Sequence, residues 1–157
     1  MKKDIFIDNN IAKNFSSPVD NEYKKLIKWL THYDDEKPQK NAHIVVSQKL
    51  INEYSRSSVN AKSLTNITVI LSIMQKQGRR IFITNQKIKD FQNKHFTKSI
   101  LKKLKSNIED REHIPVVLLS ERKYVLSLDE NFTYDLHQFP KFIVRVEKRP
   151  ENLPYNL

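Results

Sequence analysis

Short apolar runs with strand character alternate along the chain with segments whose apolar residues have helical spacing. The predicted strands span residues 4–7, 44–46, 81–84, 124–128 and 142–146. Such alternation is typical of a parallel sheet whose connecting helices cover its faces. The pattern therefore predicts an α/β fold, a three-layer α/β/α sandwich with a mainly parallel central sheet.

Amphipathic helices are predicted between these strands. Apolar residues recur there at intervals of three and four positions, which places them on one face of a helix. Ser47 is the expected N-cap of one helix, and Gly78, the only glycine in the chain, is expected just after the end of another. The longer predicted helices span residues 19–33, 48–57, 64–77 and 86–105, and shorter helices or turns follow at residues 9–15 and 132–139.

Residues 1–147 are interpreted as one domain, because a chain of 157 residues provides enough material for a single hydrophobic core. Residues 148–157 contain Pro150 and Pro154 and show no regular pattern. They are interpreted as a C-terminal tail that is extended or loosely attached.

Two of the predicted strands end on an aspartate. Residues 5–7 lead into Asp8, and residues 124–128 lead into Asp129. Ligands of open parallel sheets bind beyond the carboxyl ends of the strands, so the two carboxylates would lie close together if these strands are neighbours. Carboxylates in close proximity repel each other unless a cation offsets the charge, and Mg²⁺ and Mn²⁺ prefer oxygen ligands. The sequence therefore predicts an acidic metal site.

Two further carboxylates are candidates for this site. Glu53 lies at the border of the apolar face of its predicted helix, so it would point toward the sheet. An ordinary surface glutamate is the alternative interpretation. Asp110 opens a later helical pattern and shares a face with Ile114 and Val117. Its alternative role is that of an N-cap aspartate.

Two residues that follow Asp110 also affect this prediction. His113 stands alone beside an apolar face and is interpreted as a structural or solvent-facing residue. Pro115 removes a backbone donor, so the helix is expected to start near Ile114 or to kink there.

The formal net charge of +10 indicates a polyanionic partner, with nucleic acid as the first candidate. General enrichment in lysine, asparagine and isoleucine is the alternative explanation. The densest basic region lies within residues 86–105, where a solvated helix face is the simpler interpretation and a track for phosphate groups the other. The candidate nucleic-acid-binding residues are Lys98, Lys102, Lys103 and Lys105.

The chain contains no cysteine and no apolar run long enough to cross a membrane. A disulfide scaffold and thiolate metal sites are therefore excluded. We expect a soluble cytoplasmic protein with no membrane partner. The sequence leaves the oligomeric state open, with a homodimer as one candidate assembly.

Four acidic elements, in this order, resemble the motifs of the PIN-domain family, a metal-dependent ribonuclease fold that includes the toxins of many bacterial toxin–antitoxin pairs. The first is the buried strand that ends at Asp8 and is followed by asparagine, and the second is Glu53 on the helix after the second strand. The third is Asp110. The fourth is Asp129, with Ser127 two places before it and an aromatic residue three places after it. The resemblance covers the whole chain.

The resemblance implies that Asp8, Glu53, Asp110 and Asp129 bind one or two Mg²⁺ or Mn²⁺ ions, with Glu53 holding the attacking water. It further implies cleavage of single-stranded or loop RNA, and it makes an antitoxin protein a candidate partner. The residues expected to orient the carboxylates are Asn10, Ser127 and Asn131.

The chain departs from the family pattern at two places. His113, Ile114 and Pro115 stand where small residues are common, and Asn131 stands where a further acidic residue often follows the fourth aspartate. A catalytically inactive PIN-like RNA-binding or scaffold protein is the main alternative function. Two other enzyme classes fit less well: an aspartate-nucleophile phosphatase needs an aspartate where the chain has Asn10, and the helical arch of a flap nuclease is not apparent.

Overall fold

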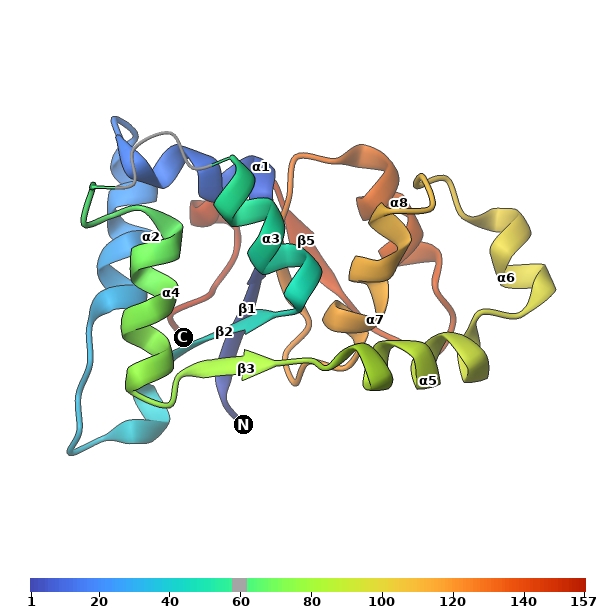
Figure 1. Cartoon of the computed structure of the whole chain (residues 1–157), viewed down its shortest axis with the longest axis horizontal. Coiled ribbons are helices and arrows are strands. Elements are labelled where there is room, and N and C mark those ends of the chain that lie inside the picture. Colours follow the sequence, from blue (N-terminus) through green and yellow to red (C-terminus); the bar gives the residue numbers. More distant parts are fainter. Residues whose placement is uncertain (58–61) are drawn as a thin grey trace.

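The computed structural model describes residues 1–57 and 62–157. Within these residues five strands form one parallel sheet in the order β3-β2-β1-β4-β5, and helices flank it (Figure 1). The predicted α/β/α sandwich with a mainly parallel sheet is confirmed. The strands are β1 (Lys3–Ile7), β2 (Ala42–Val46), β3 (Arg80–Phe82), β4 (Tyr124–Leu126) and β5 (Arg145–Glu147).

The strand order changes direction beside β1. The chain passes from β1 to β2 and β3 on one side of the sheet, and it then returns to place β4 and β5 on the other side. Phe6 pairs with Val125, and Ile7 pairs with Leu126. In open α/β sheets such a reversal leaves a crevice beyond the carboxyl ends of the two central strands. The residues that follow β1 and β4 therefore meet at this crevice.

A buried carboxylate at the other end of β1 holds β4 in place. Asp4 is 1% exposed, and its two oxygens accept hydrogen bonds from the backbone N–H groups of Glu121 at 2.8 Å and Arg122 at 2.9 Å. Buried carboxylates need such donors to offset their lost hydration. The turn that precedes β4 is thereby fixed against the start of β1.

The helices begin and end at residues that the sequence marks well. Ser47 caps α3 by accepting a hydrogen bond from the N–H of Leu50, and Gly78 follows α4 with a φ of 70°, both as predicted. The helices are α1 (Asn9–Ala12), α2 (Asn21–Thr31), α3 (Gln48–Arg56), α4 (Ile67–Lys76), α5 (Asn85–His95), α6 (Lys98–Lys103), α7 (His113–Leu118) and α8 (Glu130–Gln138). Short 3₁₀ segments are η1 (Lys13–Ser16), η2 (Pro38–Lys40), η3 (Asp110–Glu112) and η4 (Pro150–Asn152).

Most predicted elements differ by one to three residues at their ends, and two differ more strongly. The single helix predicted over residues 86–105 is wrong: it divides into α5 and α6, because Thr97 starts a new helix by accepting a hydrogen bond from the N–H of Ile100. The strand predicted over residues 142–146 is also wrong, since β5 covers only Arg145–Glu147. Phe142 instead packs against Phe91, with ring centroids 5.7 Å apart.

The C-terminal residues are firmly packed, so the prediction of a loosely attached tail is wrong. Leu153 and Tyr155 are 2% and 7% exposed, and the Tyr155 ring lies 4.9 Å from that of Trp29 in α2. Arg149 forms ion pairs with Asp20 and Glu151. This segment is anchored by apolar residues whose spacing is too irregular for a helix or a strand.

Replacement of Tyr155 by alanine should therefore destabilise the whole domain. Truncation of a buried aromatic side chain costs about 3 kcal/mol, which in a chain of this size lowers the Tm by roughly 6–12 °C. Leu157→Ala is the matched control, because Leu157 is 83% exposed and its loss should leave the Tm unchanged. Thermal unfolding followed by circular dichroism measures both. Equal Tm values for Tyr155→Ala and wild type would contradict the packing of this segment.

Candidate metal centre

Two aspartates lie at the carboxyl ends of the central strands and cap the helices that follow. The N–H of Asp8 donates to the carbonyl of Leu126 at 2.9 Å, so the ends of β1 and β4 are directly joined. One carboxylate oxygen of Asp8 accepts from the N–H of Asn9 at 2.8 Å, and one of Asp129 accepts from the N–H of Phe132 at 3.0 Å. Each helix start therefore holds one oxygen of its carboxylate.

The predicted orienting residues Ser127 and Asn10 connect these two aspartates. The Ser127 hydroxyl donates to Oδ2 of Asp8 at 2.6 Å and accepts from the N–H of Asp129 at 3.1 Å. The side-chain amide of Asn10 donates to the same Asp8 oxygen at 3.3 Å, and its oxygen accepts from the N–H of Leu128 at 3.1 Å. Asn131 is exposed, and its side chain forms no hydrogen bond to another described residue.

Glu53 reaches the site from α3, which is anchored on both sides of it. Leu50 and Tyr54 are fully buried, and the Tyr54 hydroxyl donates to the carbonyl of Ile7, one residue before Asp8. The Glu53 side chain is 19% exposed, and its charge acts on Asp8 at the end of β1. Glu53 thus lies on the border of the apolar face of α3, between core and solvent, as the sequence predicts.

Asp110 lies in η3, just before α7. Its N–H donates to Oδ1 of Asn107 at 2.8 Å, so Asn107 supports this turn and the alternative of an N-cap aspartate does not hold. Helix α7 begins at His113, so Pro115 is its third residue, where no intrahelical donor is needed. The expectation of a helix start near Ile114 is therefore confirmed.

His113 is a site residue that sequence reasoning missed. It is 2% exposed, and its Nε2 lies 2.8 Å and 3.0 Å from the two carboxylate oxygens of Glu53. One ligand atom each from Glu53, Asp110 and His113 lies within 4.8 Å of the others, a spacing that could hold a metal ion. The available signal was its position three residues after Asp110, which places both on one helical face.

Electrostatic interactions join all four predicted carboxylates. Burial raises the pKa of Asp8, with a smaller contribution from the charge of Glu53, although the hydrogen bond from Ser127 and the neighbouring His113 oppose the rise. Burial also raises the pKa of Asp110, with contributions from the charges of Asp129 and Glu53, and His113 and Lys49 oppose it. In the metal-free protein these carboxylates therefore repel one another, and a cation would relieve that repulsion.

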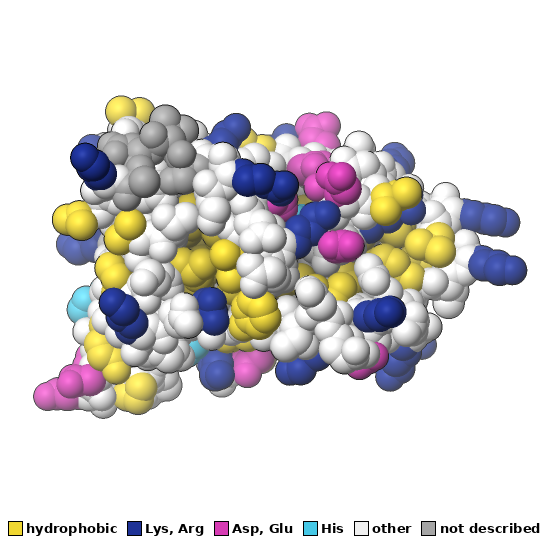
Figure 2. Space-filling model, viewed as in Figure 1, with side chains coloured by type: hydrophobic (Ala, Val, Ile, Leu, Met, Phe, Trp, Pro, Cys, Tyr) yellow, Lys and Arg dark blue, Asp and Glu magenta, His cyan; other side chains and the backbone are white. Residues whose placement is uncertain are grey.

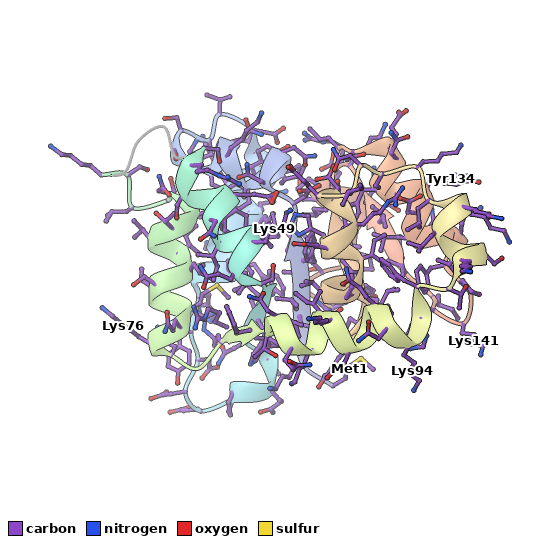
Figure 3. All side chains as sticks on the ribbon, turned by 45° about the vertical axis from the view of Figure 1, so that its right-hand side comes forward. Met1, Lys49, Lys76, Lys94, Tyr134 and Lys141 are labelled. Carbon is purple, nitrogen blue, oxygen red and sulfur yellow. The ribbon has the colours of Figure 1, made fainter. Side chains whose placement is uncertain are left out.

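A polar groove of about 430 Å³ opens over Glu53 and Asp110. Acidic side chains gather in this part of the surface, between α3 and α8, with basic side chains beside them (Figure 2). Lys49 lies on α3 near the centre of the molecule, with its Nζ 3.6 Å from the Glu112 carboxylate (Figure 3). The groove is lined by Gln48, Lys49, Asn52, Glu53, Arg56, Asn85, Glu109, Asp110 and Glu112.

The basic residues predicted to bind nucleic acid lie elsewhere. Helix α6 forms one end of the molecule, where exposed basic side chains project (Figures 1 and 2). The Lys105 ammonium lies 3.8 Å from the centre of the Tyr134 ring at that end. At the groove itself the cations are Lys49 and Arg56, which sequence reasoning missed. Lys49 lies four residues before Glu53 and Arg56 lies three residues after it, which places all three on one face of the helix. The predicted lysines are Lys98, Lys102, Lys103 and Lys105, all of them exposed.

Comparisons with protein-family models, with curated protein sequences and with solved structures found no match. The fold and the contacts within this chain therefore carry the functional argument. Among residues 1–57 and 62–157, no helix is both long and apolar enough to span a membrane.

Replacement of Ser127 by alanine should weaken metal binding without unfolding the protein. The hydroxyl holds Asp8 and supports the backbone at Asp129, and loss of such a supporting contact costs about 10–100-fold in metal affinity. Calorimetric titration with Mn²⁺ measures the effect. Ser55→Ala is the control, because among the described residues the exposed Ser55 hydroxyl donates only to the carbonyl of Ile51 within its own helix. Equal affinities for Ser127→Ala and wild type would show that Ser127 does not orient the site.

Proposed function

We propose that this protein is a metal-dependent endoribonuclease of the PIN type, which hydrolyses RNA phosphodiester bonds at a site formed by Asp8, Glu53, Asp110 and Asp129. Two lines of support are independent. The motif order resembles that of the PIN-domain family, and the sheet is an all-parallel α/β sheet with a crevice beside β1 and β4.

One observation carries the proposal. Carboxylates from four separate segments of the chain interact at the carboxyl edge of the sheet, where burial and mutual repulsion raise the pKa of Asp8 and Asp110. Shifted pKa values are concentrated at functional sites, because burial and neighbouring charges are arranged there to tune the chemistry of the site. The arrangement is unfavourable by itself, so we infer that a ligand compensates for it.

The donor atoms fit a divalent cation of the Mg²⁺ or Mn²⁺ class. Carboxylate oxygens are the ligands that both ions prefer, and the chain has no cysteine that would favour a softer metal. When bound, such a cation lowers the pKa of water and stabilises negative charge on the phosphodiester oxygens. Asp8, Asp110 and Asp129 are the proposed ligands, together with Glu53.

The residues of the chain have separate roles in this proposal. Ser127 and Asn10 keep the Asp8 carboxylate oriented through hydrogen bonds to Oδ2. Glu53 orients the attacking water and accepts its proton at a carboxylate oxygen. Lys49 and Arg56 at the groove neutralise the phosphate groups of the bound strand.

RNA is the proposed substrate because the formal net charge of +10 favours a polyanion. Single-stranded or loop RNA is the form that a groove lined by polar side chains accommodates most readily, since its backbone and bases are accessible. The exposed lysines of α6 and Lys105 would extend the contact with the RNA backbone beyond the groove.

Incubation of the purified protein with labelled single-stranded RNA tests the function. We expect cleavage with Mn²⁺ or Mg²⁺ and none with EDTA. RNA binding without cleavage would favour the alternative of a catalytically inactive PIN-like RNA-binding protein. If neither cleavage nor binding occurs, the endoribonuclease proposal is wrong.

A role as the toxin of a toxin–antitoxin pair is part of this proposal. Its antitoxin would place a basic side chain in the acidic groove, where it would compete with the metal for the carboxylates. Both components would act in the cytoplasm.

A further inference from the structure

Glu53 depends on a single neighbour for its orientation. Its carboxylate accepts hydrogen bonds only from His113 among the described residues, with both oxygens within 3.0 Å of Nε2. A glutamate side chain that is 19% exposed and has three rotatable bonds would otherwise adopt several conformations. The direction of this carboxylate is therefore set by the imidazole.

The imidazole is itself rigidly held by the core. His113 is 2% exposed, and its ring lies edge-on to Phe6 of β1, with centroids 5.7 Å apart. Phe132 of α8 contacts it from another element at 6.3 Å. Because Asp8 follows β1 and Asp129 caps α8, this packing fixes the Nε2 donor relative to both aspartates.

The surroundings of the ring define which nitrogen carries the proton. Nδ1 is buried and has no hydrogen-bond partner among the described residues. A proton there would be a buried donor without an acceptor, which is costly, whereas a bare nitrogen lone pair is tolerated better. The proton on Nε2 is instead shared with the carboxylate oxygens of Glu53.

We propose that His113 is a positioning residue that donates from Nε2 to Glu53 and thereby aims its carboxylate into the metal site. The inference rests on the proposed function. It differs from a role as a metal ligand, because ligation through Nε2 would move the proton to the unpartnered Nδ1. A metal-bound histidine normally donates from its second nitrogen to an acceptor, which His113 lacks.

Three substitutions separate the donor from the packing of the ring. His113→Phe keeps an aromatic ring between Phe6 and Phe132 but removes the donor. His113→Gln places an amide nitrogen as many bonds from the backbone as Nε2 and should restore the contact. His113→Asn is the matched control for placing an amide in this buried position. Its nitrogen lies one bond closer to the backbone, at the position of Nδ1, and so should not reach Glu53.

Calorimetric titration with Mn²⁺ gives the first readout, with circular dichroism to verify folding. We expect His113→Phe and His113→Asn to lose about 10–100-fold in affinity, the usual cost of removing a residue that orients a ligand. His113→Gln should stay within a few-fold of wild type. Affinity of His113→Phe equal to that of wild type would overturn the proposal, and so would equal losses in the Gln and Asn variants.

The nitrogen chemical shifts of His113 in labelled wild-type protein give a readout independent of catalysis. The proposal requires a protonated Nε2, both without metal and after saturation with Mg²⁺. A bare Nε2 in either state would contradict it.

These results also separate the two proposals. A wild-type protein that binds Mn²⁺ and cleaves RNA, with an unaffected His113→Phe variant, would remove only the positioning role. A wild-type protein that binds no Mn²⁺ would remove the proposed function and this inference together.

Discussion

Asp8→Asn and Asp129→Asn are each expected to reduce metal-dependent RNA cleavage by at least about 100-fold, because even residues that only orient a metal ligand contribute 10–100-fold. Asparagine retains the size of the side chain and is an equally good N-cap, so α1 and α8 should keep their starts. The lost activity would then reflect the missing carboxylate charge. Initial rates of cleavage of a labelled RNA strand with saturating Mn²⁺ measure the effect.

Asp35→Asn is the matched control for these two variants. Asp35 is exposed and lies outside the site, so its replacement removes the same charge from the protein without affecting the proposed ligands. Its cleavage rate should equal that of wild type. If Asp8→Asn cuts RNA as fast as Asp35→Asn, the acidic cluster is not the catalytic site.

Asp8→Asn should also make the metal-free protein more stable, although it abolishes activity. Burial raises the pKa of Asp8, so the charged carboxylate is disfavoured in the folded state and destabilises it at neutral pH. We expect a rise in Tm of a few degrees, since 1 kcal/mol corresponds to about 2–4 °C in a chain of this size. Saturating Mn²⁺ should reverse the order, because ligand at 100 times its Kd stabilises only the wild type by about 2.7 kcal/mol.

The pH dependence of this difference follows from the direction of the shift. The pKa of Asp8 is higher in the folded than in the unfolded state. The free energy of unfolding therefore decreases as the pH rises through the folded-state pKa. The advantage of the asparagine variant should thus be complete at neutral pH and disappear as acid protonates Asp8. Thermal scans of both proteins in EDTA over a range of pH values measure it.

Asp135→Asn provides the contrast. Asp135 is 1% exposed, but its two oxygens accept hydrogen bonds from the N–H groups of Lys105 at 2.7 Å and Ser106 at 2.8 Å. An amide cannot accept both of these backbone bonds, so this variant should lose about 1–3 kcal/mol. At Asp8 only one donor among the described residues is a backbone N–H, and the second oxygen accepts from the side chains of Ser127 and Asn10, which can reorient around an amide. Stabilisation by Asp135→Asn, or destabilisation of the metal-free protein by Asp8→Asn, would contradict the distinction between a structural and a functional buried aspartate.

The parallel α/β fold and the positions of Asp8 and Asp129 after strands could be predicted from the sequence because their signals are local. The apolar run that ends at Asp8 defines a buried strand and its end within a few residues. Ser47 and Gly78 mark a helix start and a helix end through their own backbone preferences. Glu53 follows from its position relative to Leu50 and Tyr54 on the same helix.

The features that escaped prediction depend on contacts between distant segments. The local signal at His113 is only its spacing from Asp110, because its partner Glu53 lies 60 residues earlier in the chain. The packing of Tyr155 against Trp29 likewise joins the last residues to α2.

The break between α5 and α6 does have a local signal, because Thr97 is a good N-cap. The continuous apolar spacing on both sides of Thr97 instead predicts a single helix.

The central claim is that the four carboxylates form a divalent metal site. Anomalous diffraction from crystals soaked in Mn²⁺ tests it most directly. We expect an anomalous peak bound by carboxylate oxygens of Asp8, Glu53, Asp110 and Asp129. A peak at another place in the molecule, or no peak at a Mn²⁺ concentration that supports RNA cleavage, would show that the proposed site does not hold the metal.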